Sequence, residues 1–236
     1  MTKNRGKEET DTYREEWTEM NKKLLITGLV LFMGFLMTAC GDSSLVQNEA
    51  AMNTIQPYSL SDEDSEMVSL VAPGAEDAIT QFTVDETYKR VCVGYDYYEQ
   101  GELVKKNKVK SEFPFTYDSG PKDSYGKICT FVDNDDIVIN IYGKVYDKDG
   151  KPVEADGLGS KEPLSNEHLT LDDMNTYSEC MLESPVDIEK NKKIYIYATI
   201  GDNDDDLEGA DISTLMEDKK LLSSYDKCFV FYAIFK

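Results

Sequence analysis

Hydrophobic and polar residues alternate along much of the chain after residue 75, with the two-residue period of half-buried β-strands. The clearest run spans residues 137–146, where Ile139 and Ile141 share one face. Residues 193–200 alternate in the same way, which would give Ile194, Ile196, Ala198 and Ile200 a common face. A third run covers residues 91–97. The alternation therefore predicts three strands, and it predicts that the isoleucines of the first two are buried.

The segment 227–235 is apolar on both faces, with Phe229 and Phe231 among its residues. A strand of that kind is typical of the middle of a layered structure. Turn residues separate the runs at spacings near ten, which favours an all-β fold, an antiparallel β-sandwich spanning residues 75–236. Weaker helical patterns occur near residues 172–179 and 212–222.

A different pattern precedes the domain. From Leu24 to Ala39 the chain carries sixteen residues without a charge, directly after Lys22 and Lys23. This run is short for a membrane-spanning helix and has the length of the apolar core of a signal peptide. We interpret residues 20–39 as a signal peptide and expect a helix over roughly residues 22–38 that does not pack against the domain.

The run ends in Thr38, Ala39, Cys40 and Gly41, a sequence that resembles the lipobox of bacterial lipoproteins. The resemblance implies cleavage before Cys40 and a diacylglycerol on its thiol. The mature protein would then be anchored to the extracytoplasmic face of the cell membrane, at the cell surface. A plain transmembrane anchor is the alternative. The sandwich is similar to Ig-like modules of surface lipoproteins at fold level only, which implies no activity.

Two segments flank the signal peptide. Residues 1–19 have a net charge of −2, which is wrong for the start of a signal peptide, so we interpret them as an extension upstream of a true start at Met20. Residues 40–74 are rich in Ser, Asp, Glu and Asn and have no sustained period. That composition predicts a flexible tether between the anchor and the domain.

The chain is strongly acidic, with 46 Asp and Glu against 25 Lys and Arg. Six acidic and six basic residues before residue 40 cancel, so the surplus of 21 negative charges lies after it. A surface of this charge repels nucleic acid, which we therefore exclude as a partner. The charge serves solubility, or it attracts cations or a basic partner.

Four cysteines remain once Cys40 is lipidated: Cys92, Cys129, Cys180 and Cys228. An oxidising compartment and an even count permit disulfides in any of three pairings. Three of these cysteines lie in strand-like runs, where a free thiol serves as a small core residue. Two, one or no disulfides remain open, and we expect at least one.

Three acidic turns are the best functional lead in the sequence, because hard oxygen ligands in loops are what calcium needs. Their candidate ligands are Asp133, Asp135, Asp147, Asp149, Asp202, Asp204 and Asp206. The third turn begins like an EF-hand loop but has Leu207 in place of the required Gly. Solvated turns of the same composition are the alternative. The third turn would meet residues 133–136 if the strands at 137–146 and 193–200 run antiparallel, and residues 147–149 if they run parallel.

Catalytic motifs are absent from the sequence. The single histidine, His168, has no flanking nucleophile signature, and no nucleotide-binding loop is present. We therefore predict a lipid-anchored, non-catalytic binding module without a cofactor, whose ligand is an unidentified protein or glycan. A calcium-dependent binding or adhesion domain is the first alternative. A hydrolase that uses paired carboxylates is the second.

Overall fold

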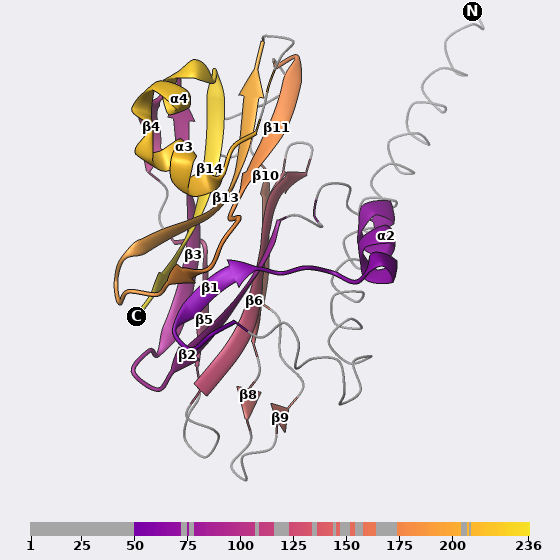
Figure 1. Cartoon of the computed structure of the whole chain (residues 1–236), viewed down its shortest axis with the longest axis vertical. Coiled ribbons are helices and arrows are strands. Elements are labelled where there is room, and N and C mark those ends of the chain that lie inside the picture. Colours follow the sequence, from indigo (N-terminus) through magenta and orange to yellow (C-terminus); the bar gives the residue numbers. More distant parts are fainter. Residues whose placement is uncertain are drawn as a thin grey trace, which may run out of the picture.

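The strands that the alternation predicts pair into two antiparallel sheets, which pack face to face (Figure 1). The structure is a computed structural model that describes residues 50–71, 75, 78–106, 109–115, 123–133, 136–143, 145–146, 152–153, 158–163, 174–203, 207 and 209–236. The predicted antiparallel β-sandwich is confirmed. Within the described residues, no helix combines the length and the apolarity needed to cross a membrane.

Sheet A has the strand order β10-β7-β6-β2-β1-β12. Its strands are β1 (Thr54–Pro57), β2 (Ile79–Asp85), β6 (Asp123–Asp133), β7 (Asp136–Gly143), β10 (Leu158–Pro163) and β12 (Val186–Asp187). The long β6–β7 hairpin forms its middle, and β12 adds two residues at one edge. A separate two-stranded ribbon joins β8 (Val145–Tyr146) to β9 (Pro152–Val153).

Sheet B has the strand order β11-β13-β14-β3-β4, with β5 beside β4 on the same side of β3. Its strands are β3 (Arg90–Glu99), β4 (Glu102–Lys106), β5 (Ser111–Pro114), β11 (Thr176–Met181), β13 (Lys193–Asp202) and β14 (Lys227–Phe235). The C-terminal strand β14 therefore lies in the interior of the sheet, as its two apolar faces predict.

The core lies between the two sheets and is aromatic on the sheet B side. Rings of β3 and β14 stack side by side, with the centroids of Tyr97 and Phe229 4.6 Å apart. Phe82 of sheet A meets Phe235 of sheet B edge-on at 5.1 Å. The predicted burial of six side chains is confirmed, since none is more than 7% exposed: Ile139, Ile141, Ile194, Ile196, Phe229 and Phe231.

Short helices cover the outer face of sheet B, beside β14 and β4 in Figure 1. They are α3 (Ile212–Glu217) and α4 (Lys219–Ser224), at the place where the sequence predicts one helix. Asp218 ends α3 and caps α4, because its side chain accepts hydrogen bonds from the first amides of α4. Residues of both helices are buried, and α3 contacts β13 and β11. The residues of β14 are buried on both faces of the strand. A third helix, α2 (Asp62–Val71), lies to the side of sheet A.

A bulge in β13 corrects the face predicted for its second half. The register of β13 against β14 shifts at Ile196, one residue before Tyr197, which faces the core. One inserted residue reverses the alternation beyond it. Ala198 and Ile200 consequently lie on the outer face, beneath α3, whereas Ile194 faces the core. The predicted common face of these isoleucines is wrong, although all of them are buried.

Two further expectations from the sequence are wrong. The tether predicted for residues 40–74 includes β1, which pairs with β2 and β12 and buries Ile55 completely. A strand of four residues is too short to show a period, so composition alone suggested a coil. The helix predicted near residues 172–179 is the edge strand β11, because its pairing with β13 outweighs a weak local preference.

The cysteines expected to form a disulfide are free and buried: Cys92, Cys129, Cys180 and Cys228. Cys180 and Cys228 lie on the two strands that flank β13, so their Cα atoms are about 10 Å apart, and a disulfide needs less than about 7 Å. Cys228 pairs with Tyr98, six residues along β3 from Cys92. The expected disulfide is therefore not formed.

Candidate functional site

The residues that the sequence singles out for function lie mostly outside the described part of the chain. Cys40 and the expected signal helix are among them, as is His168. The same holds for most of the candidate calcium ligands: Asp135, Asp147, Asp149, Asp204, Asp206 and the side chain of Asp133. Among the described residues no group of three His, Cys, Asp or Glu side chains is arranged to hold a metal ion.

The relative direction of β7 and β13 decides which acidic turns share an end of the sandwich. Gly143, the last residue of β7, packs so closely on Phe113 that an added Cβ would lie 2.5 Å from that ring. Phe113 is in β5, which pairs with the start of β3, next to the end of β14 and the start of β13. β7 therefore ends where β13 begins. The two strands run in opposite directions, and the end of β13 lies at the same end of the sandwich as the pair Asp133 and Asp136 between β6 and β7.

Two described members of these turns have partners of their own. The carboxylate of Asp136 forms an ion pair of 2.9 Å with Lys161 of β10. Asp202 is 7% exposed, and its backbone carbonyl accepts a hydrogen bond from Thr176. A calcium ion at this end would have to compete with Lys161 for Asp136. A calcium titration of the melting temperature tests the calcium alternative.

A buried ion pair lies on the outer face of sheet B and joins two strands. Asp96 of β3 has a side chain only 3% exposed, and its Oδ2 pairs with the ammonium group of Lys193 at the start of β13. The Asp96 Oδ1 atom is buried and has no hydrogen-bond partner among the described residues. Because β14 separates β3 from β13, the Lys193 side chain must cross that strand to reach Asp96.

Three tyrosines surround this pair, and we call the five residues Asp96, Lys193, Tyr98, Tyr195 and Tyr232 the cage. The ammonium of Lys193 lies 3.8 Å from the ring centroid of Tyr232 and 6.0 Å from that of Tyr195. Tyr98 and Tyr195 are hydrogen-bonded to each other. Such rings stabilise an ammonium group through their electron-rich faces.

The charge of Asp96 affects the tyrosines of the cage. Burial, followed by the Asp96 carboxylate, raises the pKa of Tyr232 to about 12. Burial and the same carboxylate raise the pKa of Tyr195, and burial raises that of Tyr98. All three phenols are therefore neutral at physiological pH. The cage thus contains one carboxylate, one ammonium and three neutral rings.

Beside the cage is a surface hollow of about 280 Å³ between β12, the start of β13 and α3. Its apolar wall includes Ile194 and Met216, and its charged residues are Asp187, Glu189, Lys192, Lys193 and Glu217. Lys192 is paired with Glu189, and Lys193 with Asp96. Asp187 and Glu217 have no ion-pair partner among the described residues, so the hollow presents negative charge beside an apolar wall.

Sequence reasoning missed this site, although β3 contains one signal of it. Asp96 is a charged residue within a strand whose neighbours are aromatic, Tyr95 and Tyr97. A buried carboxylate needs a charged or hydrogen-bonding partner. The partner is 97 residues away in the chain, and no local pattern identifies it.

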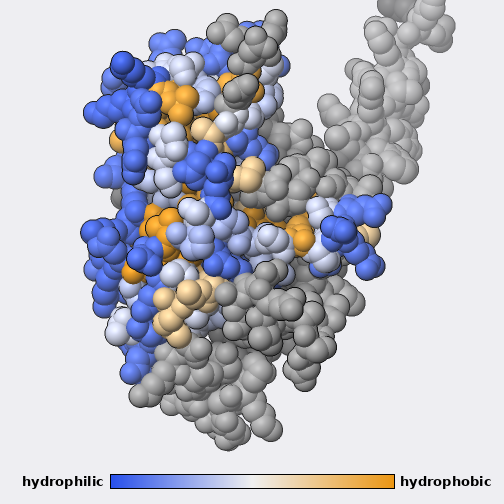
Figure 2. All heavy atoms as spheres, in the orientation of Figure 1, coloured by the Kyte–Doolittle hydropathy of each residue, from blue (hydrophilic) through white to orange (hydrophobic). Residues whose placement is uncertain are grey.

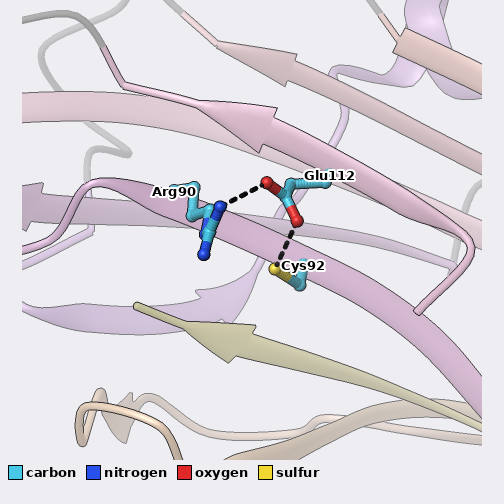
Figure 3. A network of polar contacts seen from close by, with 3 residues as sticks. All are labelled: Arg90, Cys92 and Glu112. Carbon is cyan, nitrogen blue, oxygen red and sulfur yellow. Dashed lines mark hydrogen bonds and ion pairs between the residues drawn. The ribbon is translucent and has the colours of Figure 1, made fainter. Parts of the chain in front are cut away.

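A second polar network joins the start of β3 to β5 (Figure 3). The carboxylate of Glu112 accepts a hydrogen bond of 2.8 Å from Arg90 and a weak one of 3.5 Å from the thiol of Cys92. Burial raises the pKa of Cys92, which keeps it a thiol rather than a nucleophilic thiolate. The Arg90–Glu112 pair is about half exposed and contributes little stability.

Buried thiols and phenols make the fold sensitive to alkali. Burial raises the pKa of Cys129, from an ordinary value of 9.0, and that of Tyr142, from 10.0, to about 12 each. Below pH 9 both the folded and the unfolded chain keep these protons, so the free energy of unfolding does not depend on pH through these groups. Above it the unfolded chain loses protons that the folded chain retains. Urea unfolding should show stability falling from about pH 9 to pH 11, by about 1.4 kcal/mol per pH unit from Cys129 alone. A stability that rises over this range would contradict the expectation.

Comparison with known families shows which family the chain resembles. A family model described as the YgaN domain matches residues 54–235, from the first residue of β1 to the last of β14. No curated protein and no solved structure matches the chain. The match begins at β1 and not at residue 75, in agreement with the position of β1 in sheet A.

Proposed function

We propose that this chain, which belongs to the YgaN domain family, is a lipid-anchored, extracytoplasmic binding module without catalytic activity. The single observation that carries the binding role is the negatively charged hollow beside the cage. The sequence around Cys40 supports the anchor. The described residues on the face in Figure 2 are mainly hydrophilic, with small, separate hydrophobic patches, as expected of a domain that stands in water next to a membrane.

The anchor lies close to the folded domain in the chain. Thr54 of β1 is fourteen positions after Cys40, so an extended connection would reach roughly 50 Å at most. The corrected start of the domain therefore shortens the tether that composition predicts. A lipid on Cys40 would hold the sandwich near the membrane surface, where its ligand would be another extracytoplasmic molecule.

Lipidation makes a direct prediction. Replacing Cys40 with Ala should leave the precursor uncut or move the protein out of the membrane fraction, because the thiol is the acceptor of the lipid. Fractionation together with mass spectrometry of the purified wild-type N-terminus measures this. The internal control is Cys92→Ala, which removes a buried thiol of the domain and should leave membrane partitioning unchanged. Unchanged size and partitioning of the Cys40 variant, with no lipid mass on the wild type, would exclude the anchor.

The chemistry of the hollow favours a basic segment of a protein as its ligand. Asp187 and Glu217 offer carboxylates without ion-pair partners among the described residues, and Met216 and Ile194 offer apolar contact to the stem of a Lys or Arg side chain. The surplus of acidic residues would steer a basic partner toward the domain. An uncharged glycan would not be attracted by the negative charge of the domain.

Charge reversal at the rim of the hollow tests this role. The protein should bind fluorescent tetralysine and not tetraglutamate in an anisotropy titration at low salt, and Glu217→Lys should weaken tetralysine binding about tenfold or more. The matched control is Glu102→Lys on β4, which makes the same change of net charge at the other end of sheet B. Equal weakening by both variants would mean that net charge alone attracts the peptide, and the hollow would not be the site.

A further inference from the structure

The ammonium group of Lys193 has the surroundings of a bound ligand. It pairs with the carboxylate of Asp96, which is 3% exposed. The same ammonium group lies 3.8 Å from the ring centroid of Tyr232 and 6.0 Å from that of Tyr195. Carboxylates and aromatic faces together are the chemistry that proteins use to recognise alkylammonium ligands. Here the chain's own side chain supplies the cation. Gly94 provides the space, because a Cβ there would lie 2.8 Å from the Tyr232 hydroxyl.

The cage has more capacity for a cation than Lys193 uses. Asp96 Oδ1 is buried and accepts no hydrogen bond from any described residue, although a carboxylate oxygen out of water normally has a donor. The open acceptor is an independent sign that the cage can hold a cation placed differently from the Lys193 ammonium.

Lys193 also connects the cage to the surface. Its side chain is 23% exposed, and both Lys193 and Tyr195 line the hollow. A displaced Lys193 ammonium would enter a space whose rim carries Asp187 and Glu217, which have no other ion-pair partner among the described residues. Exchange of Lys193 for a ligand cation thus leaves no charge without a counter-ion.

We propose that the cage is a subsite for a ligand's alkylammonium group, such as a lysine side chain, and that Lys193 occupies it as an internal competitor until the ligand enters through the hollow. This inference rests on the proposed function, since it takes the hollow as the route of entry. Competition of this kind multiplies the apparent affinity for the ligand by the fraction of molecules whose cage is open, so a small open fraction gives weak binding. Removing Lys193 should therefore tighten binding of the free cation.

The test uses n-butylammonium, which has the four-carbon chain and the ammonium of a lysine side chain. Its dissociation constant, from melting temperature against concentration and from the tyrosine near-ultraviolet spectrum, should be at least tenfold lower for Lys193→Ala than for the wild type. Asp96→Asn combined with Lys193→Ala should lose that gain. Uncharged n-butanol is the shape control and should stabilise Lys193→Ala much less.

Lys193→Met covers the case in which Lys193→Ala does not fold, because methionine keeps an apolar stem in place. Methylammonium, small enough to lie beside that stem, should then stabilise Lys193→Met more than the wild type. Equal effects of the ammonium probes on all variants, or an equal effect of butanol, would overturn the proposal and leave a structural ion pair. Tetralysine binding that still depends on Glu217 would in that case leave the proposed function standing.

Discussion

Replacing Lys193 with methionine is expected to lower the free energy of unfolding by about 3 kcal/mol, at the lower end of the range for breaking a buried ion pair because Lys193 is partly exposed. The variant leaves the Asp96 carboxylate buried without a counter-charge, and the desolvation of that charge is then uncompensated. Urea unfolding of the protein at neutral pH measures the loss.

A double variant separates the lost pair from lost packing. Asp96→Leu together with Lys193→Met replaces both charges with apolar groups of similar size, and much of the stability should return. The single and double variants form a thermodynamic cycle, in which a large coupling between the two positions is the expected result. Additive losses would mean that the two side chains do not interact in solution, and the cage would lose its central contact.

Ile139→Ala is the second change with a large expected effect, a loss of about 2–5 kcal/mol in the free energy of unfolding. Ile139 is 0% exposed and lies in β7, between β6 and β10, with its side chain in the core. Truncation removes buried methyl and methylene groups and leaves a cavity that the surrounding strands can fill only in part. Urea unfolding measures this loss. An unchanged slope of the free energy of unfolding against urea concentration would show that only the stability has changed.

The matched control for Ile139 is another aliphatic residue in a strand that is not buried. Val104 of β4 is 55% exposed, so Val104→Ala should change stability by no more than about 0.5 kcal/mol. Similar losses at both positions would indicate that the face of β7 assigned to the core is wrong.

The match between sequence and structure is closest where burial alone determines the pattern. The alternation around Ile139 and the apolar run through Phe229 identified β7 and β14, because a strand between a core and a second layer must carry hydrophobic residues at fixed positions. The pattern fails at Ile196, where a bulge reverses the faces of β13. It also fails at β1, whose four residues are too few to show a period.

The sequence by itself determined an all-β chain, the approximate positions of its main strands and the lipobox-like segment that ends at Cys40. Only the tertiary structure decided the order of the strands, the antiparallel relation of β7 and β13 and the meeting of Asp96, Lys193 and Tyr232. The reason is physical. Periodicity records whether a residue faces water or a core, whereas the identity of its neighbours depends on pairing between segments far apart in the chain, which leaves no local pattern.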